Sequence, residues 1–113
     1  MEKILKHLLV LFICTNIYAV DHELILSEEF PAKLSDFNFF KDASAQIPHD
    51  EVIPYELIST LFSDYSYKQR WVYVPKGMKA EYQENWVFNF PTGSALIKTF
   101  YYPVDERNPE LGK

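Results

Sequence analysis

Hydrophobic and polar residues alternate along the second half of the chain, between residues 61 and 103. In 68–74, Trp71 and Tyr73 fall on one side of an extended chain, and Arg70, Val72 and Val74 on the other. A period of two is typical of a β-strand. Further runs of this kind cover 78–82, 86–90 and 94–102. We therefore predict four antiparallel strands, with 68–74 in a central position.

Two Pro-X-Gly triplets, Pro75-Lys76-Gly77 and Pro91-Thr92-Gly93, punctuate these runs. Proline presets φ at the second position of a turn, and glycine accepts the left-handed conformation that follows. With a polar turn at 83–85, these signals predict a meander. The predicted fold is thus mainly β: an antiparallel meander or partial sandwich of about four strands with a short N-terminal helix.

The predicted core lies on the third strand, where Trp86, Phe88 and Phe90 share one face. Large buried side chains contribute roughly 1.5 to 3 kcal/mol each. We expect this face to be the main stabilising contact.

Residues 20–54 form a lead-in segment before the predicted β domain at 55–103. Its apolar patch at 24–26 predicts a short edge strand or an extended arm. Ser35 is placed to cap a short helix that turns Leu34, Phe39 and Phe40 inward. The polar tail at 104–113 contains no further strand, so the last strand of the sheet is expected to keep an open edge.

The first nineteen residues have the pattern of a secretory signal peptide. Lys3 and Lys6 precede an apolar run at 8–13, and Ala19 ends a plausible cleavage site. Polar residues interrupt the run too early for a membrane span. A lipid anchor on Cys14 is the alternative, although Ile13 is large for a lipobox. We expect a periplasmic or secreted protein whose mature form begins near Val20.

Charge and cysteine content exclude several classes of function. The 113-residue chain, enough for one domain, carries a formal net charge of −5, and its basic residues form no stripe. Nucleic acids and anionic membranes are therefore not expected partners. Cys14 is the only cysteine, so the mature chain lacks the Cys-x-x-Cys-His motif of covalent haem attachment. No cofactor or metal is predicted.

A series of short elements resembles a known family. These elements are Leu34-Ser35-Asp36-Phe37, Pro54-Tyr55-Glu56-Leu57, Leu61-Phe62-Ser63-Asp64-Tyr65, Lys68-Gln69-Arg70-Trp71-Val72, Pro75-Lys76-Gly77, Phe90-Pro91-Thr92-Gly93 and Lys98-Thr99-Phe100-Tyr101-Tyr102-Pro103. In this order they are similar to the N-terminal region of uncharacterised exported bacterial proteins often labelled diheme c-type cytochromes. Ile58-Ser59-Thr60 departs from the family's pattern. The resemblance implies a periplasmic redox or sugar-oxidation setting and a chain truncated before the haem-binding part.

Two groups of residues are candidate sites. Ser63, Asp64, Lys68 and Arg70 could form a small polar site, although Asp64 could instead satisfy turn amides or pair with Arg70. A second group, the aromatic residues Trp71, Tyr73 and Trp86, could stack on sugar rings if one face of the sheet is open, but core packing is the commoner explanation of such aromatics.

His49-Asp50-Glu51 supplies three potential metal ligands, but adjacent side chains diverge, so a solvated loop is the prediction. No catalytic motif is present, and we predict no enzyme activity.

Two hypotheses of function follow. The first is a non-catalytic exported β module, a truncated piece that docks on a protein partner which completes its sheet. The alternative is a carbohydrate-binding module that uses exposed aromatics.

Overall fold

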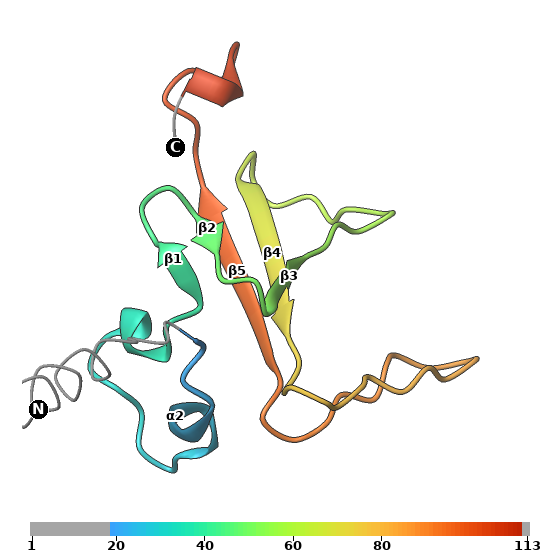
Figure 1. Ribbon diagram of the computed structural model, residues 1–113. Coiled ribbons are helices and arrows are strands. Elements are labelled where there is room, and N and C mark those ends of the chain that lie inside the picture. Colours follow the sequence, from blue (N-terminus) through green and yellow to red (C-terminus); the bar gives the residue numbers. More distant parts are fainter. Residues whose placement is uncertain (1–18, 112–113) are drawn as a thin grey trace, which may run out of the picture.

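The computed structural model describes residues 19–111, so that the predicted signal peptide, apart from Ala19, and the alternative anchor at Cys14 lie outside the described part. Figure 1 shows the order of elements along the chain. They are α2 (His22–Leu26), a 3₁₀ helix (Leu34–Phe37), β1 (Phe40–Asp42), β2 (Ile47–Pro48), β3 (Val52–Pro54), β4 (Tyr67–Tyr73), β5 (Ala95–Tyr101) and a second 3₁₀ helix (Pro109–Leu111).

The main sheet has three antiparallel strands in the order β3-β4-β5. β4 and β5 pair along their whole length, from Tyr67 opposite Tyr101 to Tyr73 opposite Ala95. On the other side of β4, Val52 in β3 lies opposite Tyr73. A smaller sheet is formed by the β1-β2 hairpin. The mainly β, antiparallel fold and the central position of 68–74 are therefore confirmed.

The predicted meander is wrong in its middle, because β4 already has both edges occupied by β3 and β5. Residues 74–94 leave the sheet as one long excursion (Figure 1). A single bridge holds it together, in which Glu81 and Asn89 exchange backbone hydrogen bonds of 2.8 and 3.0 Å. The two Pro-X-Gly turns do form, with Gly77 at φ 80° and Gly93 at φ 85°, but they mark the two ends of this excursion.

The predicted core face of the third strand is also wrong. Trp86, Phe88 and Phe90 are 80, 53 and 38% exposed, because no element covers the excursion that carries them. The Phe88 ring contacts Tyr82 and Phe90 instead, at 6.0 and 6.3 Å between ring centroids. An alternating pattern alone does not make a buried strand.

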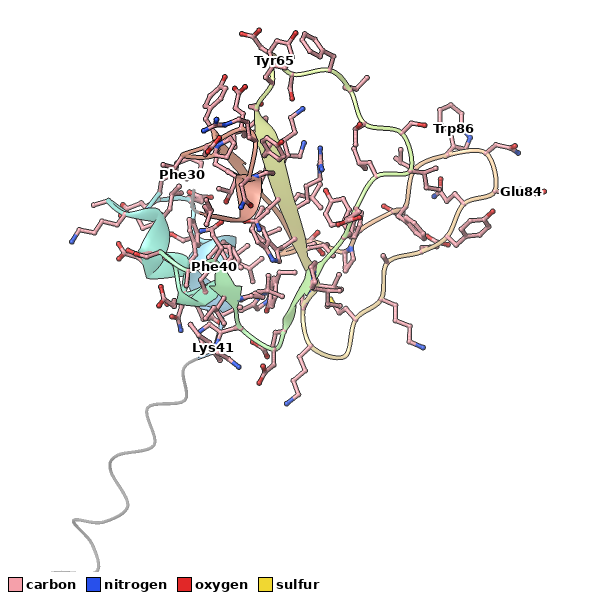
Figure 2. The ribbon with its side chains drawn as sticks, turned by 90° about the horizontal axis from the view of Figure 1, so that it is seen from above. Phe30, Phe40, Lys41, Tyr65, Glu84 and Trp86 are labelled. Atoms are coloured by element: carbon pink, nitrogen blue, oxygen red, sulfur yellow. The ribbon has the colours of Figure 1, made fainter. Side chains whose placement is uncertain are left out.

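The core lies on one face of the main sheet. Val20, Val52, Trp71 and Tyr73 are its buried hydrophobic residues within the described chain. Half-buried side chains from the N-terminal segment and β1 cover them, and the Phe40 ring meets Trp71 edge-on at 5.0 Å. Figure 2 shows this N-terminal layer on one side of the sheet and the loops on the other. The sheet is thus packed on one side.

The N-terminal segment differs from its prediction in two places. Residues 22–26 form a short helix rather than a strand or arm, because the Asp21 carboxylate accepts a hydrogen bond of 2.9 Å from the Leu24 amide. The helix predicted at Ser35 is a 3₁₀ turn that begins at Leu34, and Leu34 points outward, 84% exposed. Phe39 and Phe40 do pack on the core as predicted.

The two turn glycines offer a matched test of this packing. An added Cβ at Gly93 would lie 2.5 Å from Cε1 of His22, whereas at Gly77 it would meet nothing within 4 Å. Both positions are left-handed, so alanine costs about 1 to 2 kcal/mol at either. Gly93→Ala should cost about 1 to 3 kcal/mol more, because His22 must move off Tyr73. Urea unfolding of the two variants measures the difference, and equal midpoints would show that α2 is not packed on this turn.

Candidate functional site

The predicted polar site is brought together only in part. Ser63, Lys68 and Arg70 line one pocket of about 310 Å³ between the sheet and the loop that precedes β4. Asp64 is not among its lining residues. Within the described chain the Asp64 carboxylate makes no hydrogen bond or ion pair, so neither alternative for it, turn amides or Arg70, is its partner.

The two serines of this loop have a structural role. Ser63 and Ser66 each donate a side-chain hydrogen bond to the carbonyl of the other, at 3.2 and 2.7 Å. Between them Asp64 and Tyr65 both adopt positive φ, at 52° and 60°, which the paired hydroxyls help to hold. The hydroxyls are therefore occupied in closing a tight turn, and the described residues that line the two adjoining pockets include no histidine to activate a nucleophile.

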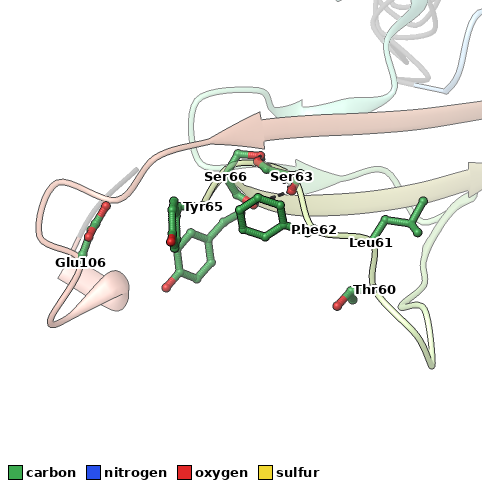
Figure 3. Close-up of a pocket in the computed structure, with 8 residues that line it drawn as sticks. Thr60, Leu61, Phe62, Ser63, Tyr65, Ser66 and Glu106 are labelled. Carbon is green, nitrogen blue, oxygen red and sulfur yellow. Dashed lines mark hydrogen bonds between the residues drawn. The ribbon is translucent and has the colours of Figure 1, made fainter.

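An open groove lies on the outer side of the same turn. It has a volume of about 600 Å³, and Figure 3 shows its lining residues. They are Thr60, Leu61, Phe62, Ser63, Tyr65, Ser66, Tyr67 and Glu106. The Phe62 and Tyr65 rings meet edge-on at 5.4 Å and are both largely exposed. The groove is therefore shallow, with aromatic walls and one carboxylate at its rim.

Three basic side chains gather on the face of the main sheet opposite the core. Alternation along β4 and β5 places Lys68, Arg70 and Lys98 on this face, while Trp71 and Tyr73 point to the core. Arg70 and Lys98 are direct cross-strand partners. Like charges in such positions destabilise a sheet when nothing neutralises them.

These three cations have no acidic partner within the described residues. Glu56 lines the same pocket as Lys68 and Arg70 but forms no ion pair with either. The Lys68 ammonium lies instead over the Phe100 ring, 5.4 Å from its centroid. In a chain of net charge −5, an unpaired cluster of three cations on one sheet face is a candidate site for acidic groups.

Apolar side chains surround this cluster and complete what we call the open face. Its members from the three strands are Ile53, Lys68, Arg70, Val72, Leu96, Lys98 and Phe100. Ile53, Leu96 and Phe100 are largely exposed. The open face therefore presents both apolar area and positive charge.

Sequence reasoning found Lys68 and Arg70 but missed Lys98. The signal that could have found it is the shared alternation of 67–73 and 95–101, once these two segments are paired directly. To pair these segments, one must recognise that residues 74–94 do not belong to the sheet. The excursion itself alternates like a strand, so the sequence does not reveal this.

The predicted aromatic stacking site is wrong, because two of its three residues are buried. Trp71 and Tyr73 are each only 4% exposed, so neither ring offers a face to a sugar. Trp86 is exposed at the outer end of the excursion, away from both (Figure 2). The structure does not bring the three together into one platform.

The side chains of the His49-Asp50-Glu51 triplet diverge as predicted. The predicted solvent exposure holds for the two acidic residues but not for the histidine. His49 is buried, whereas Asp50 pairs with Lys41 on the neighbouring strand β1. The hydrogen bond from Lys41 lowers the pKa of the Asp50 carboxyl below its ordinary value. Glu51 accepts a hydrogen bond from the Val20 amide at 3.3 Å. Among residues 19–111, no three His, Cys, Asp or Glu side chains are grouped to hold a metal ion.

Tyr73 is a buried titratable group that belongs to the hydrophobic core. Burial, and after it the negative charge of Glu51, raise the pKa of its hydroxyl above the ordinary value. The raised pKa means that the folded state favours the neutral phenol. This contribution is present below the unfolded pKa of 10.0 and is lost as pH rises above it.

Comparisons with known proteins give no relatives: no family model matches the chain, and no curated protein or solved structure does. None of the described helices is long and apolar enough to cross a membrane.

Proposed function

We propose that this chain is an exported, non-catalytic β module that docks on a protein partner through the open face and the adjoining edge of β5. The partner is an extended, acidic segment that adds to the sheet beside β5, in the redox or sugar-oxidation setting that the family resemblance implies. The observation that carries the proposal is the unpaired cluster Lys68, Arg70 and Lys98 on an exposed sheet face.

The edge of β5 supports addition of a strand. Among the described residues β5 pairs with β4 alone, so its other edge has no strand partner along 95–100. Strand addition supplies main-chain hydrogen bonds for affinity, and alternate side chains supply specificity. A new strand beside β5 would place its own residues next to Leu96, Lys98 and Phe100 on the open face.

The chemistry of the open face selects the partner's side chains. A carboxylate beside Lys98 would relieve its repulsion with Arg70. Apolar residues on the incoming strand would cover Leu96 and Phe100, which are exposed. An alternation of acidic and apolar residues therefore fits this face, and a basic segment is excluded by like-charge repulsion.

The carbohydrate alternative has less support. Of its three candidate aromatics only Trp86 is exposed, so a single indole on the excursion would have to supply all the stacking. Sugar recognition needs both stacking and oriented hydrogen bonds. The open face offers the better-defined site.

A peptide titration followed by amide NMR tests the docking proposal. The probe is a synthetic peptide in which valine and glutamate alternate, and the matched control peptide alternates valine and lysine. We expect the acidic peptide alone to shift the amides of residues 95–100. Lys98→Glu should weaken its binding about tenfold or more, whereas Lys79→Glu on the excursion should leave it unchanged. Equal binding of both peptides, or shifts confined to other regions, would exclude the open face as the docking site.

A further inference from the structure

Val20, the first residue of the expected mature chain, is buried in the core. Val20 is 6% exposed and belongs to the core, beside Val52, Trp71 and Tyr73. In a chain cleaved after Ala19, Val20 would be the first residue, and chain ends are usually poorly ordered unless something ties them down.

Polar contacts hold the backbone around Val20. The Val20 amide nitrogen lies 3.3 Å from Oε2 of Glu51 and donates a hydrogen bond to it. The Asn38 side-chain amide donates to the Ala19 carbonyl at 2.6 Å, and the Asp21 amide donates to the Phe37 carbonyl at 3.0 Å. The nitrogen of residue 20 is therefore fixed beside a carboxylate.

We infer that cleavage between Ala19 and Val20 creates an α-ammonium group that forms an ion pair with Glu51. The inference rests on the export part of the proposed function. Hydrolysis adds water across the Ala19–Val20 peptide bond, so that Ala19 leaves as a carboxylate and the Val20 nitrogen becomes an amine. With an ordinary pKa of about 7.7 to 8.0, this amine is mostly protonated at neutral pH. A neutral donor at 3.3 Å is thereby replaced by a cation at the same place.

None of the other titratable groups described near the Val20 nitrogen competes with Glu51 as the counter-ion of the α-ammonium group. The Asp21 carboxylate is turned away to accept the Leu24 amide at the start of α2. The Tyr73 hydroxyl is neutral at this pH, and it lies 3.4 Å from Nδ1 of His22. His49, two residues before Glu51 in sequence, is buried. Among these groups Glu51 is the one that contacts the Val20 nitrogen.

Burial also determines when cleavage takes place. In the folded chain Val20 is inaccessible and the Ala19 carbonyl is held by Asn38, so the bond between them is shielded from a peptidase. Cleavage therefore precedes folding, and the new amine enters the fold together with the core. The ion pair then stabilises the chain that was cut at this bond, because one extra or one missing residue would move the α-ammonium group away from Glu51.

The test uses protein expressed from the full-length chain in an export-competent bacterium and recovered after processing. Intact mass and N-terminal sequencing locate the cut, and NMR or acylation kinetics measure the pKa of the α-amine. Glu51→Gln keeps a hydrogen-bond acceptor but removes the charge, and Glu84→Gln on the excursion is the matched control. We expect Glu51→Gln to lower the pKa of the amine by about half a unit, the scale of a partly exposed ion pair. Glu84→Gln should leave this pKa unchanged.

Selective acetylation of the α-amine gives a second measurement. It should lower the melting temperature of the processed protein, and clearly less so in the Glu51→Gln variant, because both changes remove the same pair. An α-amine whose pKa is the same in both proteins would overturn the ion pair. A cut at another bond would also overturn it while leaving export intact. Retention of Met1 in the cytoplasm would instead overturn export, and with it the premise.

Discussion

Trp71→Ala should unfold this protein or come close to it. Trp71 is 4% exposed, lies at the centre of β4 between Pro54 on β3 and Ile97 on β5, and meets the Phe40 ring edge-on. Removing a buried indole costs about 3 to 5 kcal/mol. Domains are typically stable by only about 5 to 15 kcal/mol, and a small one-sided core belongs at the low end. The measurement is urea unfolding followed by circular dichroism.

Trp86→Ala is the matched control, because it removes the same side chain from an exposed position. Its effect should stay within about 0.5 kcal/mol. If the two variants had equal denaturation midpoints, the excursion would have to be packed against the sheet, and the core assigned to β4 would be wrong.

The processed chain, purified alone, should associate with itself. The main sheet is covered on one side only, and the open face exposes Ile53, Leu96 and Phe100 beside the edge of β5, which has no strand partner along 95–100 among the described residues. Such an edge is a template for pairing with another copy. Light scattering and sedimentation at increasing concentration should show oligomers, and addition of a partner segment or of downstream sequence should reduce them.

Leu96→Glu tests whether the open face is responsible. The new carboxylate lies on the face that carries Arg70 and Lys98, so it removes apolar area and adds a favourable charge. We expect it to shift the population strongly toward monomer, whereas Val87→Glu on the excursion should have little effect. A monodisperse monomer of the unaltered chain at high micromolar concentration would mean that these residues close the fold by themselves.

Local signals in the sequence were sufficient for the turns and the two long strands. Glycine after Pro-X predicts a left-handed turn residue, and both Gly77 and Gly93 adopt it. The alternation around Trp71 likewise predicted a central strand. The prediction succeeded because Trp71 and Tyr73 lie on the same face of β4 and both are buried.

Local signals could not predict which distant segments pair with each other. The run 86–90 alternates as strongly as 95–101, yet only the second pairs with β4. What decides between them is β3, a three-residue strand in a segment rich in proline, which occupies the other edge of β4. The same holds for the candidate site, since Lys98 joins Lys68 and Arg70 only through the β4-β5 register.

The excursion at residues 74–94 is the loop that must close when β4 and β5 pair. Tyr73 and Ala95 stand at the base of this loop, so among the β4-β5 pairs theirs closes the shortest stretch of chain. Closing a loop costs entropy that rises only slowly, by about 0.6 kcal/mol for each doubling of its length. The pairs from Val72–Leu96 to Tyr67–Tyr101 can then form one after another. The length of the excursion is therefore free to vary with little effect on the stability of the sheet.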